Sequence, residues 1–174
     1  FKEAGRLYRL SAEQGNAIAQ SYLGYMYYNG QGVPQDYKEA IRLYRLAAEQ
    51  GNALAQYNWG LAYANGLGVQ QDYQEAIRLY RLAADQGDGY AQVNWGNMYY
   101  NGQGVPQDYQ EAIRLYRLAA DQGNALAQYN LGYMYEYGKG VLQDYKEAVK
   151  WWRLSAKQGF AEAQSNLGKN YRQG

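Results

Sequence analysis

Apolar and polar residues alternate along the chain with a helical period. In the segment YKEAIRLYRLAAEQ, which spans residues 37–50, apolar side chains recur three and four residues apart, so they share one face of an amphipathic helix. Asp36 precedes this segment and Gly51 follows it. Aspartate is a common N-cap, and glycine is a common left-handed residue after a helix. The pattern therefore predicts a helix over residues 37–50.

A second helix is predicted immediately after the first. Asn52 is suited to cap it, and the helix is expected to run from Ala53 to about Asn65 and to end at Gly66. Two helices of this length joined by short linkers pack antiparallel. No stretch shows the two-residue alternation of a strand. The predicted fold class is therefore all-α.

The helix pair recurs at a constant interval of 36 residues, without an insertion. The Gln-Gly pairs that mark this interval end at Gly15, Gly51, Gly87, Gly123 and Gly159. Repetition at this length is typical of a stacked array in which each hairpin packs on its neighbours. We expect one domain over residues 1–174, built from units 1–36, 37–72, 73–108, 109–144 and 145–174.

The recurring residues resemble the Sel-1-like repeat, a relative of the tetratricopeptide repeat. The shared pattern is A-x-A-Q-x-x-L-G-x-x-Y-x-x-G-x-G-V-x-x-D-Y-x-E-A-x-x-x-Y-x-x-A-A-x-Q-G, and it covers essentially the whole chain. The resemblance implies a right-handed α-solenoid of about five helix-turn-helix repeats with a concave groove for protein–protein contacts. It also implies an adaptor or assembly scaffold rather than an enzyme.

Composition narrows the functions further. The chain has 174 residues, of which 47% are hydrophobic, which is enough for a buried core. Its 17 basic and 16 acidic residues leave a net charge of +1, so no overall field attracts nucleic acid or an anionic membrane. Cysteine and histidine are absent, which excludes disulfides, thiolate chemistry and histidine-based catalysis. No catalytic residue, metal site, cofactor or membrane segment is indicated, and the sequence does not point to a compartment.

Tyrosine carries the main functional signal. Thirteen of the 22 tyrosines recur at the 36-residue step, in rows that include Tyr37, Tyr44 and Tyr63, and we interpret these rows as core. Seven of the other nine fall at positions equivalent to 54, 57, 61 and 64, which share one face of the second helix. We name these positions and their equivalents the variable face. The resemblance to the Sel-1-like repeat implies that this face points into the concave groove.

The variable face supplies the candidate binding residues. Tyrosine offers a large, stiff contact with a hydrogen-bonding tip, which suits a binding surface. The candidates are Tyr25, Tyr28, Tyr57, Leu61, Tyr90, Asn97, Tyr100, Tyr129, Tyr133, Glu136, Lys169 and Arg172. We expect them to bind a protein or a peptide.

Single-stranded RNA is the alternative ligand, because helical repeats of similar length read RNA base by base. Such repeats use mainly small polar side chains, whereas the variable face is rich in tyrosine and leucine. RNA binding would weaken steeply with added salt, which separates the two hypotheses.

Two further expectations concern particular positions. Trp59 and Trp95 occupy the row that holds Leu23 in the first unit, so both indoles are expected in the core. The first unit begins without a preceding helix and has Gly5 where the second unit has Ile41. Glycine weakens a helix, so we expect the N-terminal end to fray and to be available for end-to-end self-association.

Overall fold

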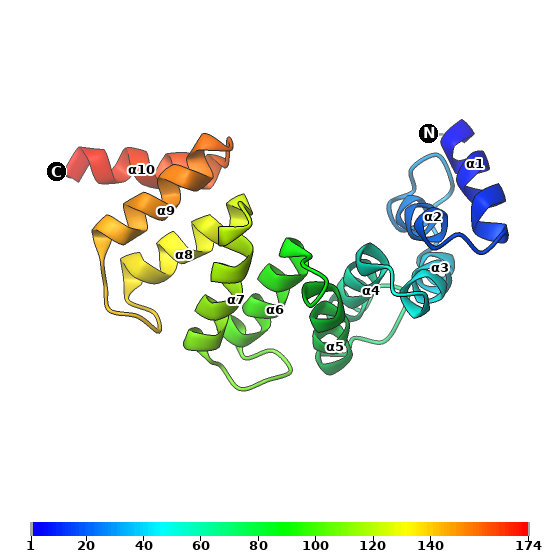
Figure 1. The fold of residues 1–174 in the computed structure, drawn as a ribbon, viewed down its shortest axis with the longest axis horizontal. Coiled ribbons are helices and arrows are strands. Elements are labelled where there is room, and N and C mark those ends of the chain that lie inside the picture. Colours follow the sequence, from blue (N-terminus) through cyan, green and yellow to red (C-terminus); the bar gives the residue numbers. More distant parts are fainter. Residues whose placement is uncertain (1, 174) are drawn as a thin grey trace. The chain divides into compact units, whose positions relative to one another are not determined.

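All regular structure described between residues 2 and 173 is α-helical in a computed structural model of the chain (Figure 1). The structure describes the burial and the contacts of side chains for residues 2–170. The helices are α1 (Lys2–Glu13), α2 (Ala17–Asn29), α3 (Tyr37–Glu49), α4 (Ala53–Asn65), α5 (Tyr73–Ala84), α6 (Gly89–Asn101), α7 (Tyr109–Asp121), α8 (Ala125–Tyr137), α9 (Tyr145–Lys157) and α10 (Ala161–Gln173). The predicted all-α fold class is confirmed.

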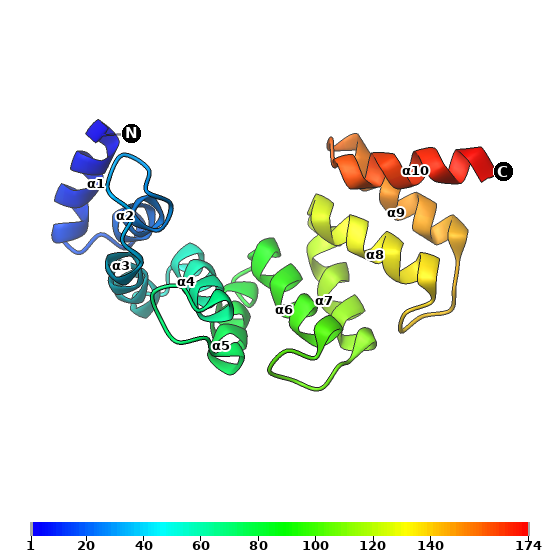
Figure 2. The same cartoon turned by 180° about the vertical axis from the view of Figure 1, so that it is seen from behind.

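The contacts divide the chain into two compact units, residues 1–88 with α1 to α5 and residues 89–174 with α6 to α10. Within each unit, helices that follow one another along the chain pack side by side, and wide loops follow the even-numbered helices (Figures 1 and 2). We call the odd-numbered helices first-type and the even-numbered helices second-type. One domain over the whole chain remains a proposal.

The caps that the sequence predicts fix the ends of the helices. At the start of α3, the Asp36 carboxylate accepts a hydrogen bond from the Glu39 backbone N–H at 3.0 Å. At the start of α4, the Asn52 side chain accepts one from the Ala55 N–H at 2.8 Å. Gly66 follows α4 in the left-handed conformation, with φ 68°. These interactions satisfy backbone groups that a helix end otherwise leaves unpaired.

A glycine on each of α2, α4, α6 and α8 packs against an aromatic ring of the next helix. A Cβ atom placed on Gly60 of α4 would lie 2.8 Å from the Tyr80 ring of α5, so the ring needs a residue without a side chain. Tyr80 is only 1% exposed as a result. The same arrangement joins Gly24 to Tyr44, and Gly96 to Tyr116. This contact sets the close approach of each second-type helix to the first-type helix after it.

Glutamine side chains add a polar link between successive hairpins. In unit 1–88, the Gln50 Nε2 donates to Gln20 Oε1 at 2.9 Å, and the Gln20 amide donates to the Ala12 carbonyl at 3.2 Å. In unit 89–174, Gln122 donates in the same way to Gln92 at 3.0 Å. Buried amides need such partners. Sequence reasoning used these glutamines as repeat markers and missed the links.

The structure corrects the interpretation of the tyrosine rows. Among the described tyrosines of these rows, only Tyr44, Tyr80 and Tyr116 are fully buried, at 1–2% exposure, while Tyr8 of the same row is half-buried. Tyr27, Tyr63, Tyr99 and Tyr135 are half-buried, and so is Tyr37, the first residue of α3; Tyr171 lies outside the residues whose side-chain surroundings are described. Recurrence identified scaffold positions correctly but overestimated their depth.

The two central tryptophans also lie shallower than expected. Leu23 is 3% exposed, whereas Trp59 and Trp95 in the same row are half-buried. Trp59 packs at the edge of the cluster formed by Ala40, Tyr44 and neighbouring alanines. An indole is larger than a leucine side chain, so in this row it extends past the edge of the core.

Candidate functional site

A pocket of about 370 Å³ lies in unit 89–174, where α6, α7 and α8 meet. We name it the α6–α8 pocket. It is lined by Asn97, Tyr100, Asn101, Tyr116, Tyr129, Asn130, Tyr133 and Met134. Four of these residues, Asn97, Tyr100, Tyr129 and Tyr133, are candidates from the variable face. The structure therefore brings together candidates from two different repeats.

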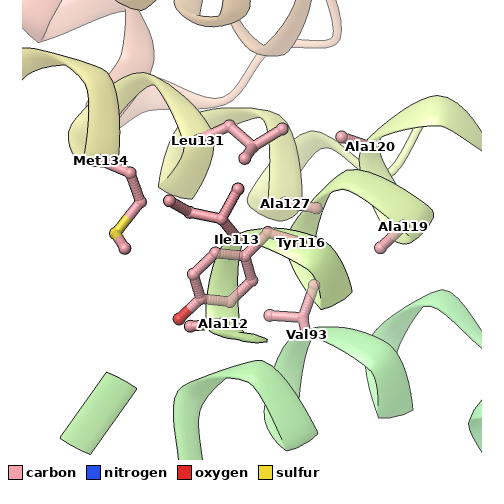
Figure 3. Packing of buried hydrophobic residues seen from close by; sticks show 9 residues of the cluster. All are labelled: Val93, Ala112, Ile113, Tyr116, Ala119, Ala120, Ala127, Leu131 and Met134. Carbon is pink, nitrogen blue, oxygen red and sulfur yellow. The ribbon is translucent and has the colours of Figure 1, made fainter. Parts of the chain in front are cut away.

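Helix geometry explains how the lining side chains converge. Asn97 and Tyr100 are three residues apart on α6, and Tyr129 and Tyr133 are four apart on α8, so each pair shares a helix face. Tyr116 reaches the pocket from α7, between these two helices. Figure 3 shows its ring inside the apolar cluster, with the hydroxyl oxygen pointing away from Val93.

The Tyr116 hydroxyl fixes the orientation of Asn97. The hydroxyl donates to Asn97 Oδ1 at 2.7 Å, and Asn97 Nδ2 lies 3.4 Å from Asn94 Oδ1. Burial raises the pKa of Tyr116 far above its ordinary value, so the hydroxyl keeps its proton and remains a donor. Asn97 Oδ1 thus accepts from Tyr116 while Nδ2 donates to Asn94 Oδ1, and these two hydrogen bonds hold the side chain in one orientation.

Aromatic neighbours hold the tyrosine rings of the pocket in place. The Tyr100 ring centroid lies 5.3 Å from that of Tyr109 and 6.4 Å from that of Tyr133. Tyr133 also contacts Tyr137, with 4.5 Å between centroids. Tyr129 lies 5.2 Å from Phe160 in the same way. Rings restrained by packing lose little freedom when a ligand binds.

One cation lies beside the pocket. The Lys139 Nζ is 5.7 Å from the Tyr100 ring centroid and 5.0 Å from that of Tyr109, distances suited to cation–π attraction. It also lies 3.4 Å from the Tyr109 hydroxyl, and this hydrogen bond raises the pKa of Lys139. Lys139 is not among the lining residues, and none of the described lining side chains is charged.

Tyr100 keeps its proton more firmly than an ordinary tyrosine. Burial raises the pKa of its hydroxyl, and a hydrogen bond with Tyr133 raises it further. The Tyr100 hydroxyl is therefore protonated at physiological pH.

The candidates in unit 1–88 lie on the same face of α2 and α4. Tyr25 is 43% exposed, while Tyr28, Tyr57 and Leu61 are half-buried. The Tyr28 ring packs edge-on against Tyr37, with centroids 5.1 Å apart. Burial raises the pKa of Tyr28, although a hydrogen bond with Asn65 opposes this shift.

The remaining candidates do not line the α6–α8 pocket. Tyr90 is 61% exposed, Glu136 is half-buried, and Lys169 is exposed. Arg172 lies outside the residues whose side-chain surroundings are described.

Part of the variable face is core. Ser21 and Val93 are the equivalents of Tyr57, yet they are 0% and 1% exposed. Val93 packs with Ala112 and Tyr116 in the cluster of Figure 3. A small side chain at this position is covered by the next first-type helix, whereas a tyrosine extends past it. Sequence variation at this position therefore reflects the size of the side chain that the core accepts, as well as any role in binding.

Sequence reasoning missed four lining residues, namely Asn101, Tyr116, Asn130 and Met134. Tyr116 recurs at the 36-residue step and was interpreted as core, and Asn130 recurs at the same step. The asparagine row, which includes Asn58 and Asn94, was a signal that could have revealed Asn130 as a polar residue beside the variable face.

Metal ligation and membrane insertion find no support among the described residues. No group of three or more acidic side chains is placed to hold a metal ion, and no helix is long and apolar enough to cross a membrane.

Solved structures resemble this chain closely. A Sel1 repeat protein from Oxalobacter formigenes shares 42% identity with a TM-score of 0.86, over 90% of this chain and 64% of that protein. A protective antigen of uropathogenic Escherichia coli shares 39% identity with a TM-score of 0.84, over 98% of this chain and 36% of that protein. The chain thus spans less than two thirds of either relative. The cysteine-rich protein B of Helicobacter pylori shares 26% identity with a TM-score of 0.61, over 79% of this chain and 99% of that protein. No curated protein matches.

The Sel1 repeat model matches residues 1–16, 17–52, 53–88, 89–124, 125–160 and 161–174. Its period is again 36 residues, but each complete match begins at a second-type helix. The matched pairs α2 with α3 and α4 with α5 are those joined by the glycine and tyrosine contact. The matches together cover the whole chain, and each complete match contains one such helix pair. The chain belongs to the Sel1 repeat family.

Proposed function

We propose that this chain is a protein-interaction scaffold that holds an extended segment of a partner protein in the α6–α8 pocket. Sel1 repeat proteins are in general interaction scaffolds, which supports the broader part of the proposal. The specific part rests on the pocket, because Tyr100 and Tyr133 pack against the core and still leave part of their rings open to a ligand. Tyr100 and Tyr133 are half-buried, whereas the scaffold tyrosine Tyr116 is 2% exposed.

The chemistry of the pocket suits a peptide. Half-buried tyrosine rings offer apolar area, and asparagine side chains offer the same donor and acceptor groups as a peptide bond. Prominent arginines of the first-type helices are engaged elsewhere: Arg42 pairs with Glu39 at 2.7 Å, and Arg114 pairs with Glu111 at 2.6 Å. The described residues that line this pocket include no charged group that could bind the phosphates of RNA. We therefore favour a protein partner.

Selection of binders from a random peptide library tests the proposal with the full chain. Peptides selected on the unmodified chain should lose about tenfold or more in affinity for Tyr100→Ala and for Tyr133→Leu. Both replacements occur naturally at equivalent positions of this chain, as Ala64 and Leu61, so they are compatible with the fold.

Arg117→Ala provides the matched control, since Arg117 is an exposed residue of α7 outside the pocket. It should leave the affinity unchanged. Selected peptides that depend on Arg117 and tolerate both tyrosine replacements would place the binding surface on the first-type helices and refute the proposal. Selection of RNA but not peptide, with steep salt dependence, would favour the alternative.

We also propose head-to-tail self-association through the N-terminal end. Leu7 of α1 is 54% exposed, whereas its equivalent Leu43 in α3 is 2% exposed and packs with Leu23 of α2. On α10, nothing lies within 4 Å of a Cβ placed on Gly168, although the equivalent Gly60 contacts Tyr80. A second copy of the chain would join through the helix contact that recurs within the chain, with Leu7 on one side and Gly168 on the other.

Sedimentation velocity tests this association. The unmodified chain should form larger species as its concentration rises, and Leu7→Glu or Gly168→Leu alone should reduce them. A mixture of the two variants should stop at a dimer, because each variant keeps one intact side. A monomer at all concentrations would contradict the proposal.

A further inference from the structure

A second pocket, of about 320 Å³, lies in unit 1–88 among α1, α2 and α3. We name it the α1–α3 pocket. Its lining includes Leu23 and Tyr27 of α2, Leu43 and Arg42 of α3, and Arg9 of α1. We propose that this pocket binds the indole ring of a tryptophan side chain of a partner protein. The later repeats hold tryptophans of their own beside the equivalent residues, and these tryptophans indicate the ligand.

Leucine and tryptophan share one pair of neighbouring positions wherever a second-type helix packs on the next first-type helix. In the first such pair, Leu23 of α2 and Leu43 of α3 belong to the same buried cluster. The equivalent pairs along the chain are Trp59 with Leu79, Trp95 with Leu115, and Leu131 with Trp151. Each later pair thus contains one tryptophan, from either the second-type or the first-type helix, whereas the first pair contains two leucines. The α1–α3 pocket lies beside this leucine pair.

Trp95 shows where the ring of such a tryptophan lies. The Arg114 guanidinium carbon is 6.0 Å from the Trp95 ring centroid, and the Tyr99 ring centroid is 6.4 Å from it. Arg42 and Tyr27 are the equivalents of Arg114 and Tyr99, and both line the α1–α3 pocket. The pocket is thus bounded by the same two kinds of side chain that flank the Trp95 indole.

Trp151 reaches the equivalent junction from the opposite helix. It packs against the cluster that contains Leu131, and the Lys150 ammonium lies 5.8 Å from its ring centroid. Lys150 is the equivalent of Arg42. A cation therefore flanks the ring whichever helix supplies the tryptophan, so the junction accepts the ring independently of its point of attachment. A tryptophan from another chain meets the same requirement.

Arg42 is already held in place for an aromatic ring. Its Nε and Nη2 donate to the Glu39 carboxylate at 2.8 and 2.7 Å, and Arg114 bonds to Glu111 through the same two atoms at 2.8 and 2.6 Å. Tryptophan gives the strongest cation–π attraction of the aromatic side chains, and an aliphatic side chain gives none. The pocket should therefore prefer tryptophan to leucine.

Three polar residues of the lining already have partners within the chain. The Gln20 side chain donates to the Ala12 carbonyl at 3.2 Å and accepts from Gln50 at 2.9 Å, while Arg9 donates to the Tyr27 hydroxyl at 3.1 Å. An apolar ring can enter without leaving these groups unpaired. The volume of about 320 Å³ is at the low end for ligand pockets, which suits one side chain rather than a larger ligand.

Fluorine NMR with the full chain tests the proposal. The probe is a blocked glycine–fluorotryptophan–glycine peptide, whose resonance should shift and broaden when it binds. The corresponding tryptophan peptide should displace it, whereas the leucine peptide should need at least about tenfold higher concentration because it lacks an aromatic face. Equal displacement by the two peptides would overturn the proposal.

Leu23→Trp places a tryptophan of the chain itself in the pocket. It should weaken probe binding at least about tenfold, because a close-packed site cannot hold two rings. The fold should accept it, since Trp59 and Trp95 occupy the equivalent positions. Ile18→Trp is the matched control, because it adds a tryptophan to the same helix at a residue that is 59% exposed and outside the lining. It should leave binding unchanged, and probe binding that survives Leu23→Trp would refute the assignment.

Trp59→Leu provides a second test that does not depend on the first variant. It recreates a leucine pair with Leu79 at the junction of α4 and α5, so each chain should bind a second probe molecule. Leucine stands at the equivalent positions Leu23 and Leu131, and circular dichroism melts confirm that the variant is folded. An unchanged stoichiometry in the folded variant would contradict the proposal.

Further outcomes separate this inference from the proposed function. Tyr133→Leu should leave probe binding unchanged, and a loss there would place the probe in the α6–α8 pocket and overturn the inference. Free fluoroindole that binds while the peptide does not would overturn the assignment to a partner protein in favour of a small indole compound. If the probe responds to Leu23→Trp but library-selected peptides tolerate replacement of Tyr100 and Tyr133, this inference stands and the proposed function fails.

Discussion

At the residue scale, tyrosine serves two purposes that differ in what lies opposite the ring. Tyr44, Tyr80 and Tyr116 face a glycine on the preceding helix and are almost completely buried. Tyr100 and Tyr133 face other tyrosines and remain half-exposed beside a pocket. The same side chain is thus a packing element in one row and, in our proposal, a binding element in another.

Buried tyrosines should make the fold sensitive to alkaline pH. Burial raises the pKa of Tyr44 well above its ordinary value of 10.0, so the folded state favours the neutral ring. Its contribution to the free energy of unfolding is complete below pH 10 and falls as the pH rises above that value. Linkage gives a loss of up to about 1.4 kcal/mol per pH unit for one such group.

Urea denaturation at about pH 8 and about pH 11 measures this effect. The unmodified chain should lose more stability between these values than Tyr44→Phe, which has no hydroxyl to ionise. Tyr90→Phe is the control, because Tyr90 is 61% exposed and should behave like the unmodified chain. Equal losses in Tyr44→Phe and the unmodified chain would refute the account of this tyrosine.

At the element scale, helix pairing depends on a glycine that admits an aromatic ring. The sequence pattern predicted the helix pairs and their caps, because periodicity and capping are local properties. The partner of each glycine was not predictable in this way, since Tyr80 and Gly60 belong to different hairpins. Gly5 shows the same limit: it was interpreted as a helix-weakening residue, yet a Cβ there would lie 3.1 Å from the Met26 methyl group.

The candidate site was predictable in part. Variation at the 36-residue step identified Tyr100, Tyr129, Tyr133 and Asn97, which line the α6–α8 pocket. It could not find Asn130, which recurs, and positions such as that of Val93 vary because the core accepts different sizes there. Burial is a property of tertiary packing, so it becomes visible only in the structure.

Two equivalent glycines should respond in opposite ways to alanine. Gly60→Ala should destabilise the fold by about 1–3 kcal/mol, because the new methyl group would lie 2.8 Å from the Tyr80 ring and 3.3 Å from the Ala76 carbonyl oxygen. Gly168→Ala should stabilise it by about 0.5–1 kcal/mol, since nothing lies within 4 Å and alanine favours a helix. Thermal melts measure both. Similar shifts in the same direction would show that ring packing does not fix this glycine.

At the scale of the whole molecule, each helix draws stability from the neighbour that covers it. The Leu43 side chain of α3 is covered by α2, while Leu7 and Leu10 of α1 are 54% and 48% exposed. Local stability should therefore differ along the chain although the repeats are similar in sequence.

Native-state hydrogen exchange tests this difference. In a dilute sample we expect α1 to be the least protected helix and α3 to be strongly protected. Attachment of an additional Sel1 repeat before residue 1 should raise the protection of α1, because the added helix would cover Leu7. Faster exchange in α10 than in α1 would contradict this expectation.

The central claim is that recurring residues build the scaffold while residues of the variable face bind a partner. A substitution scan of the full chain that reads folded abundance and binding of a library-selected peptide tests it most directly. We predict that replacements at Tyr44, Tyr80 and Tyr116 lower abundance, whereas replacements at Tyr100 and Tyr133 preserve abundance and lower binding. Equal losses of abundance in both groups, or undiminished binding when Tyr100 and Tyr133 are replaced, would contradict the claim.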